Sequence, residues 1–523
     1  MRTFLSRSFR TLLPLLCLAP TLSRGLERAP TPPKKPNIIF ILADDISPGS
    51  FSCYGENGAV PTPHIDRIAK TGVQFETCFA PASCGPSRAL LMTGTYANTT
   101  GAFSNKIWAF ESRRVLFQRH TSWAKLLGEA GYATAIAGKW HCNRSNPWSR
   151  EVGFDEYCLW ENTGRIKTIL GTDPVAAGLR NKDAGEDRYW NSPMIRNGEY
   201  YGTGPDVYGP DARCDFLLDF MDRKTKENTP FVAYWPTVLV HGPIARTPNS
   251  GENTSDEVRF REMVEYLDLL VGRMVEKTKD LGIYENTWFI FGSDNGTARI
   301  AKNRGIESGV RVPFVLSGPG VAARGKTLEL TDYSDIAPTL LEIGGIRPEA
   351  QPEMDGKSLV PFLTEKTDSH RDWIYSYAGP AQVLRTKTHL LEARSEFLGK
   401  EQGRLYFTGN WRQKANYRQL DARAPGYPDA RQNFTEILNS IPSHLCRDHS
   451  YWSTEAGKEW LAENSNLEKL ATKLLDDDNE PIAEPAGNGL IGSILSGLIF
   501  YERRGTRNGH PLFLFPYPRQ YPH

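Results

Sequence analysis

The stretch Asn37-Ile38-Ile39-Phe40-Ile41-Leu42, which Ala43 separates from Asp44 and Asp45, is the strongest indication of the fold in this sequence. Its unbroken apolar character and its β-branched residues are typical of a strand buried on both faces of a mostly parallel sheet. Sheets of this kind assemble ligand sites at the carboxyl ends of their strands. The two acidic residues after the run therefore lie where a functional site is expected.

Similar apolar runs alternate with amphipathic helical patterns along the chain. This alternation predicts a doubly wound α/β fold with a mostly parallel sheet. Beyond it, short strand-like runs at 373–406 and a helical pattern at 455–475 predict a smaller α+β domain. The predicted strands of the first part are 73–79, 132–137, 231–235, 288–291 and 312–316, and the predicted helices are 122–130, 211–223, 256–281 and 334–343.

The N-terminus has the composition of an export signal. Three arginines precede an apolar stretch at 12–22, and small residues follow it. This is the order of a signal peptide, predicted here at 1–25, with an uncleaved amphipathic anchor as the alternative. The stretch is short and contains Pro14 and Pro20, so we expect no transmembrane segment. The destination depends on the host: periplasmic, secreted or lysosomal.

The predicted organisation has four parts. A Pro-rich and Lys-rich linker at 26–36 follows the signal, a catalytic domain spans 37–365, and a smaller C-terminal domain with a tail spans 366–523. Over all 523 residues, 62 Lys and Arg nearly balance 61 Asp and Glu, for a formal charge of +1. Such a balance gives no electrostatic reason to expect a nucleic acid or an anionic membrane as a partner.

The cysteines point to one unpaired thiol. Eight are present, and Cys17 in the predicted signal leaves seven in the mature chain. An odd number in an exported protein requires a free thiol, for which Cys84 is the candidate. The other six could form disulfides, but their pairing cannot be read from the sequence. Because no paired Cys-x-x-Cys arrangement occurs, a structural zinc site is not expected.

Two acidic segments after predicted strands favour a metal site. Asp44 and Asp45 follow the first strand, and Asp294 with Asn295 follows the run WFIFGS. Each pair alone is better explained by a turn or a helix cap after a strand. Together they bring carboxylate and amide oxygens to one edge of the sheet, and such ligands suit Ca²⁺ or Mg²⁺.

The segment Cys84-Gly85-Pro86-Ser87-Arg88-Ala89-Leu90-Leu91-Met92-Thr93-Gly94 predicts a helix that begins close to Pro86. Residue 84 then lies near a helix N-terminus, where unpaired backbone N–H groups favour an anion. From these residues alone, Cys84 is either a structural cysteine or a thiol nucleophile with a lowered pKa.

This segment also resembles the maturation motif of the formylglycine-dependent type I sulfatases, which belong to the alkaline phosphatase superfamily. The resemblance rests on five segments in the family's order, covering roughly 36–320. Besides the cysteine motif and the two acidic segments, these are GYATAIAGKWH at 131–141 and ESGVRVP at 307–313, where Ser308 replaces a glycine. The resemblance implies an alkaline phosphatase-like fold and hydrolysis of sulfate esters.

The resemblance further implies that a formylglycine-generating maturation enzyme oxidises Cys84 to an aldehyde, whose hydrate attacks sulfur. It implies one divalent cation, Ca²⁺ favoured over Mg²⁺, and catalytic roles for several side chains. Arg88 would hold the nucleophile, Lys139 and Lys302 would contact the sulfate, His141 would orient the nucleophile, and His241 would protonate the leaving oxygen. After His141, Cys142-Asn143 replaces the family's Leu-Gly, so that loop could differ. The implied metal ligands are Asp44, Asp45, Cys84, Asp294 and Asn295.

Two other functions fit the same motifs. One is a phosphodiesterase or phosphonate monoester hydrolase of the same superfamily, which comparison of aryl sulfates with aryl phosphodiesters would distinguish. The other is a catalytically inactive, glycan-binding pseudosulfatase, although no proposed ligand is missing from the chain. The expected substrate is a sulfated small molecule or glycan. No pattern in the sequence specifies the sugar, endo or exo action, or the oligomeric state.

Overall fold

A strand at the centre of a mixed sheet carries the first acidic pair. The computed structural model describes residues 35–441, except 57, 104, 106–111, 143–145, 162, 180–187, 253, 299, 323–324, 380 and 396–399. The predicted signal, most of the linker, the predicted helix at 455–475 and the tail lie outside these residues.

In order across the larger sheet, the strands are β11 (Gly325–Asp332), β2 (Val73–Phe79), β10 (Phe314–Ser317), β8 (Thr287–Ser293), β1 (Asn37–Ala43), β7 (Phe231–Pro236), β3 (Ala133–Gly138), β4 (Glu156–Trp160), β5 (Pro193–Arg196) and β6 (Glu199–Gly202).

β1 is parallel to both of its neighbours, β7 and β8, and all its residues are buried. The neighbouring pairs β7–β3 and β3–β4 are parallel as well, whereas β10 and the β5–β6 hairpin run antiparallel. The predicted doubly wound, mostly parallel α/β architecture is confirmed for this central part. As a result, β1, β7, β8 and β3 present their carboxyl ends at the same edge.

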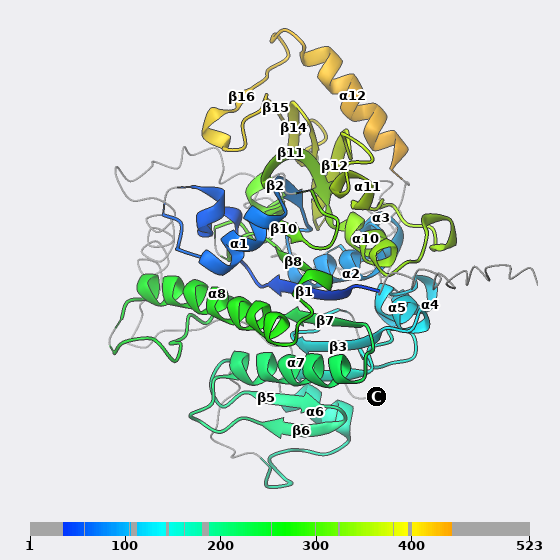
Figure 1. Ribbon diagram of the computed structural model, residues 1–523. Coiled ribbons are helices and arrows are strands. Elements are labelled where there is room, and N and C mark those ends of the chain that lie inside the picture. Colours follow the sequence, from blue (N-terminus) through cyan, green and yellow to red (C-terminus); the bar gives the residue numbers. More distant parts are fainter. Residues whose placement is uncertain are drawn as a thin grey trace, which may run out of the picture. The chain divides into compact units, whose positions relative to one another are not determined.

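Successive side chains of β1 enter different cores. Ile38, Phe40 and Leu42 pack with α2 (Cys84–Thr93), α5 (Trp123–Glu129) and α10 (Ile336–Ile343). The alternate residues of β1 pack with α1 (Pro63–Thr71), α7 (Gly209–Lys226) and α8 (Asp256–Asp280). Figure 1 shows α7 and α8 running beside the central strands. Each fully buried aliphatic side chain contributes about 1.5–3 kcal/mol relative to an exposed one, so both helix layers stabilise the position of β1.

The sequence patterns located the central strands of this sheet but missed β4, β11 and two local features. The run at 312–316 was predicted as one strand, yet Pro313 separates β9 (Arg311–Val312) from β10, since proline cannot donate to a strand ladder. β9 pairs with β2. The β5–β6 hairpin was not predicted. Its turn is Asn197-Gly198, with φ of 46° and 91°, a pairing typical of two-residue hairpin loops.

A second sheet is antiparallel and contains β12 to β16 in sequence order, as expected for the smaller C-terminal part. The predicted domain boundary at 365 falls between α11 (Val360–Leu363) and β12, and the division into domains stays a prediction. The remaining strands and helices are β12 (Trp373–Ala378), β13 (Ala381–Thr386), β14 (His389–Arg394), β15 (Arg404–Phe407), β16 (Arg418–Gln419), α3 (Ala97–Thr100), α4 (Ser112–Arg119), α6 (Thr163–Leu170), α9 (Glu307–Val310) and α12 (Tyr427–Ser440).

The motif ESGVRVP connects the two sheets. Its Glu307 forms a buried ion pair with Arg385 of β13, and the Glu307 amide donates to Glu392 of β14 at 3.0 Å. Arg385 also donates to the hydroxyl of Tyr417 at 2.7 Å and to the carbonyl of Trp411 at 3.0 Å. A charge buried this deeply requires its partner. The motif therefore has a structural role in joining the second sheet to the first.

Two expectations concern bilayers and disulfides. Within the described part of the chain, every helix is too short or too polar to cross a bilayer. The six described cysteines, Cys53, Cys78, Cys84, Cys142, Cys158 and Cys214, are all free thiols. The sequence left open the pairing of six cysteines other than Cys84. The five of these that the structure describes form no disulfide with one another, and the sixth, Cys446, lies outside the described residues.

Replacing Arg385 by Met is expected to lower the free energy of unfolding by about 3–5 kcal/mol, because it leaves the Glu307 carboxylate buried without a partner. Urea unfolding of the full chain measures this change. Arg423→Met is the matched control, since the Arg423–Asp421 pair is largely exposed, and it should change stability little. The double replacement Glu307→Met/Arg385→Met should lose less than the sum of the single losses. Equal stability of Arg385→Met and wild type would contradict this role.

Candidate active site

Helix α2 places residue 84 at its first turn. It begins at Cys84, with Ser83 as the preceding cap residue, and Pro86 follows within the first turn. The amide of Gly85 donates to the side-chain oxygen of Asn105 at 2.8 Å. All ten residues of α2 are buried. The Cys84 side chain is thus held at a helix N-terminus, where backbone N–H groups favour negative charge, although its burial opposes such a charge.

The carboxyl ends of β1 and β8 bring the two acidic segments together. Asp44 follows β1 directly, and Asp294 follows β8. The amide of Asp45 donates to the Asp294 carboxylate at 3.1 Å, and the amide nitrogen of the Asn295 side chain donates to Asp45 at 2.8 Å. Asp45 has a φ of 61°, in the left-handed region that costs energy for a non-glycine residue. These contacts hold that conformation.

Three buried carboxylates are paired with three cations. Arg88 contacts Asp294 at 2.7 Å and Asp44 at 3.6 Å. Lys139, directly after β3, contacts Asp44 at 2.7 Å, and Lys302 contacts Asp45 at 2.6 Å. Arg88 lies one helical turn after Cys84 and also donates to the Lys139 carbonyl at 2.5 Å. The pairing makes it possible to bury these charges, since an unpaired buried charge costs several kcal/mol.

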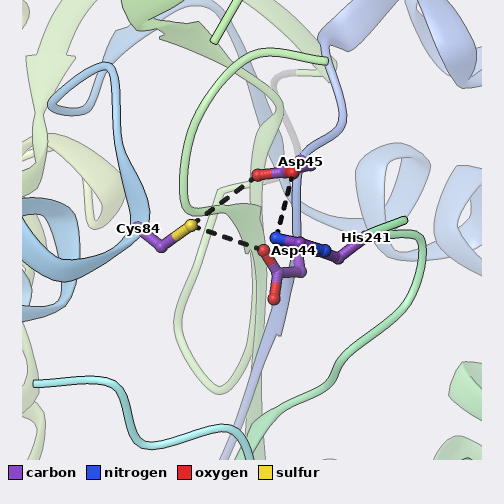
Figure 2. A group of neighbouring side chains, drawn as sticks. All are labelled: Asp44, Asp45, Cys84 and His241. Carbon is purple, nitrogen blue, oxygen red and sulfur yellow. Dashed lines mark hydrogen bonds and ion pairs between the residues drawn. The ribbon is translucent and has the colours of Figure 1, made fainter. Parts of the chain in front are cut away.

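The Cys84 sulfur lies among these groups. It is 3.7 Å from a carboxylate oxygen of Asp44 and equally far from one of Asp45, and the Lys302 ammonium is 2.9 Å away. Figure 2 shows Cys84 directed toward the two aspartates, with His241 on the other side of Asp45. The atom attached to the β-carbon of residue 84 therefore faces both the carboxylates and a cation.

Burial, followed by the charge of Asp294, raises the pKa of the Cys84 thiol to about 12, despite the opposing effect of Lys139 and Lys302. At neutral pH this group is a neutral thiol. Since the thiolate is the reactive form of cysteine, this raised pKa gives no support to the thiol-nucleophile alternative.

Two of the carboxylates have shifted pKa values in opposite directions. Burial by itself would raise the pKa of Asp44, but Lys139, His241 and Arg88 hold it well below its ordinary value. Burial and the neighbouring Asp44 raise the pKa of Asp294 to about 6. Asp44 is thus a carboxylate at neutral pH, as a ligand for a cation must be.

His241 lies in the loop after β7, and about a quarter of its side chain is exposed. Its Nε2 is 3.5 Å from an Asp45 oxygen, and its Nδ1 lies 2.7 Å from the Gly242 carbonyl. Burial and the charge of Lys139 lower the pKa of His241 to about 4. Its imidazole faces the group formed by Asp44, Asp45 and Cys84, where it can transfer a proton.

His141 is less tightly integrated. Its backbone has a φ of 45°, and its side chain is solvent-accessible. The surrounding protein and the charges of Lys139 and Arg88 lower the pKa of His141 well below its ordinary value. Among the described residues, no hydrogen bond joins its imidazole to the other predicted catalytic groups. The predicted role of His141 in orienting the nucleophile stays a prediction.

The donor groups fit a hard divalent cation. Ligand atoms of Asp44, Asp45, Cys84 and His241 all lie within 4.8 Å of one another. The side-chain oxygen of Asn295 is buried and has no hydrogen-bond partner among the described residues, as expected of an atom that a cation would contact. Asp294 is outside this group of four, and its carboxylate accepts from Arg88 and from the Asp45 amide. Oxygen ligands of this kind suit Ca²⁺ or Mg²⁺.

One contact to His241 was missed by the sequence analysis. An Nη atom of Arg188 lies 2.5 Å from its Nδ1, and the Arg188 guanidinium stacks over the Trp160 indole at 4.7 Å. Arg188 belongs to a loop without a recognisable motif, and it lies 53 positions from His241. No local pattern could have indicated this proximity.

Comparison with known proteins identifies the class. A family model described as Sulfatase matches residues 36–346. N-acetylgalactosamine-6-sulfatase of Canis lupus familiaris is 31% identical over 375 residues, which cover 67% of this chain and 69% of the relative. The ulvan-active sulfatase of Formosa agariphila is 31% identical over 370 residues, covering 69% and 64%. The chain belongs to the sulfatase family, whose members hydrolyse sulfate esters.

A solved structure agrees with this assignment at the level of the fold. The crystal structure of Ps i-CgsB in complex with k-i-k-neocarrahexaose superimposes with a TM-score of 0.61 at 22% identity. The match covers 84% of this chain and 99% of that chain. The predicted membership of the sulfatase family, the alkaline phosphatase-like fold class and the sulfuric ester hydrolase activity are confirmed.

Adding Ca²⁺ to the metal-free protein is expected to raise the thermal midpoint, with a smaller effect for Mg²⁺. A hundredfold excess over the Kd corresponds to about 2.7 kcal/mol of stabilisation when only the folded state binds. Asn295→Ala should reduce the Ca²⁺-dependent rise, whereas Asn416→Ala, at an exposed position, should keep it. Differential scanning fluorimetry with and without chelator measures both. A Ca²⁺ response in Asn295→Ala equal to that of wild type would remove Asn295 from the metal site.

Proposed function

We propose that this sulfatase hydrolyses sulfate esters of carbohydrates, with a formylglycine made from Cys84 and one divalent cation, Ca²⁺ favoured over Mg²⁺. The observation that carries the proposal is the position of the Cys84 sulfur, between two aspartates and Lys302 at a buried helix N-terminus. That sulfur marks where an oxygen of the hydrated aldehyde would lie. The ligands proposed for the cation are Asp44, Asp45, residue 84, Asp294 and Asn295.

When both groups are present, the hydrated aldehyde supplies an oxygen nucleophile with a second hydroxyl for releasing sulfate, and the cation supplies positive charge. The chain's own residues prepare this chemistry. Lys139 and Lys302 place two ammonium groups where sulfate oxygens would bind. Arg88 holds Asp294 and the carbonyl of Lys139, and so orients the ligands around residue 84.

His241 is the proposed general acid. When the bond between sulfur and the leaving oxygen breaks, its electron pair stays on that oxygen, which then requires a proton. His241 Nε2 faces Asp45 beside the proposed nucleophile and can deliver this proton. With its pKa lowered to about 4, the imidazole is mostly neutral at neutral pH in the unliganded site, so His241 has to take up a proton before it can act as the acid.

The carbohydrate part of the proposal rests on the relatives, which are named for N-acetylgalactosamine 6-sulfate and ulvan, and on the neocarrahexaose bound in the similar structure. The N-terminal pattern at 1–25 supports export and, with it, modification of Cys84 by a formylglycine-generating enzyme as a partner. No observation favours the phosphodiesterase or pseudosulfatase alternative over this function.

Mass spectrometry of the peptide containing residue 84 tests the first part. After co-expression with a maturation enzyme, the peptide should be lighter by the difference between H₂S and oxygen, about 18 Da. Cys84→Ala should reduce turnover of aryl sulfates by at least about 10³-fold, because the nucleophile is gone. Cys214→Ala, which alters another buried cysteine in α7, should keep activity. A persistent thiol in a protein with full sulfatase activity would refute the formylglycine.

Replacing His241 by Ala should lower kcat on a sugar sulfate by about 10²–10⁴-fold, the usual contribution of a general acid. The loss should be much smaller on 4-nitrophenyl sulfate, because nitrophenolate is stable without a proton. His389→Ala, at a partly buried histidine of β14, is the control and should affect neither substrate. Equal losses on both substrates would assign His241 to another role, such as metal binding.

A further inference from the structure

Arg188 is a fourth cation at this site, and it differs from the other three in its partners. The other three, Arg88, Lys139 and Lys302, all form ion pairs with buried carboxylates. The described side-chain contacts of Arg188 are instead the Nδ1 of His241 at 2.5 Å and the indole of Trp160 at 4.7 Å, and they include no carboxylate. Its charge is therefore additional to a set of charges that is already balanced.

The backbone around Arg188 is firmly held. The carbonyl of Arg188 accepts from the buried guanidinium of Arg213 at 2.9 Å. The next residue, Tyr189, is fully buried, and its hydroxyl donates to the carbonyl of Val238 at 2.9 Å and to that of His241. Trp190 donates to the Arg246 carbonyl at 2.9 Å. These contacts attach 188–190 to the loop that carries His241, so the guanidinium is placed in advance of substrate binding.

The orientation of the guanidinium leaves donors available. One Nη contacts His241, and the flat face lies over Trp160. Among the described residues, the remaining Nη and the Nε have no hydrogen-bond acceptor. A guanidinium with free N–H groups along one edge binds a planar carboxylate or a sulfate through two hydrogen bonds. Stacking on an indole also stabilises the cation and restricts its rotation.

We propose that Arg188 binds an anionic substituent, a carboxylate or a second sulfate, on the sugar that leaves during hydrolysis. The inference rests on the proposed function, in which His241 protonates the leaving oxygen. Arg188 contacts the Nδ1 of this imidazole, so its guanidinium lies directly beside the proposed general acid, whose Nε2 faces Asp45. Arg188 thus makes the enzyme selective for acidic sulfated glycans over neutral ones.

The test compares two substrates that differ only in charge. The first is a disaccharide of 6-O-sulfated N-acetylgalactosamine and a uronic acid, and the second is its methyl ester. In the wild-type enzyme, kcat/KM should be higher for the acid than for the ester by about 10- to 100-fold, mainly through KM, the usual effect of a charge-assisted hydrogen bond. In Arg188→Ala this ratio should fall toward one. Both substrates require the same proton from His241, so a general loss of catalysis lowers both rates and leaves the ratio intact.

Arg246→Ala is the matched control. It removes an exposed arginine from the adjoining loop, and the ratio should stay at the wild-type value. Arg188→Lys keeps the charge without the planar fork and should give an intermediate ratio. A disaccharide that has a second sulfate but no uronic acid distinguishes the two anions. Its kcat/KM is compared with that of the same disaccharide lacking the second sulfate. If this ratio depends on Arg188 and the acid-to-ester ratio does not, the bound group is the sulfate.

The inference is overturned if neither the acid-to-ester ratio nor the ratio for the second sulfate differs between wild type and Arg188→Ala. It is also overturned if the ratio that falls in Arg188→Ala falls equally in Arg246→Ala. Thermal midpoints of the variants show whether each one is folded. If Arg188→Ala does not fold, the same comparison is made with Arg188→Gln. If the wild type carries the aldehyde yet hydrolyses neither sugar, the proposed substrate class fails. In that case calorimetry measures the affinities of Cys84→Ala and of Cys84→Ala/Arg188→Ala for the acid and for the ester. The ratio of the two affinities should be high in Cys84→Ala and close to one in the double variant.

Discussion

The pairing of three buried carboxylates with three cations is the constraint on which the site depends. Asp44, Asp45 and Asp294 lie at the ends of two adjacent parallel strands, where their mutual repulsion would prevent burial if they were unpaired. Arg88, Lys139 and Lys302 come from three different segments and compensate this charge. The same cations are suited to hold a sulfate, so the electrostatics that permit folding also prepare the site for an anion.

The scaffold explains why these groups can be held so closely. β1 is fully buried, with helices on both faces, and α2 is buried along its whole length. The ESGVRVP segment adds a second connection, because Glu307 links the loop that carries Lys302 to Arg385 in the antiparallel sheet. The second sheet thus supports one wall of the site through a buried ion pair.

In the proposed mechanism, chemistry and selectivity depend on different parts of the molecule. The groups proposed to act on the sulfate follow strands β1, β3 and β8 or begin helix α2. Arg188 lies in a loop whose position is set by hydrogen bonds of Tyr189 and Arg213. Loops vary more readily than a buried sheet, so selectivity for the leaving sugar can change while the reacting groups stay in place. This division is consistent with sulfatases of one fold that are named for different sugars.

The sequence by itself determined the central buried strands, the helices that correspond to α2, α5, α7, α8 and α10, and the side chains whose spacing is local. Cys84 and Arg88 are one helical turn apart whatever else the chain does, and Asp44 must follow the strand that precedes it. Only the tertiary structure decided which cation pairs with which carboxylate, that Pro313 divides a strand, and that Arg188 contacts His241. Asp45 and Asp294 are 249 positions apart, and Arg188 and His241 are 53 apart. Periodicity acts over a few residues, whereas contacts over such separations depend on the path of the intervening loops and on which charges must be compensated when the chain packs.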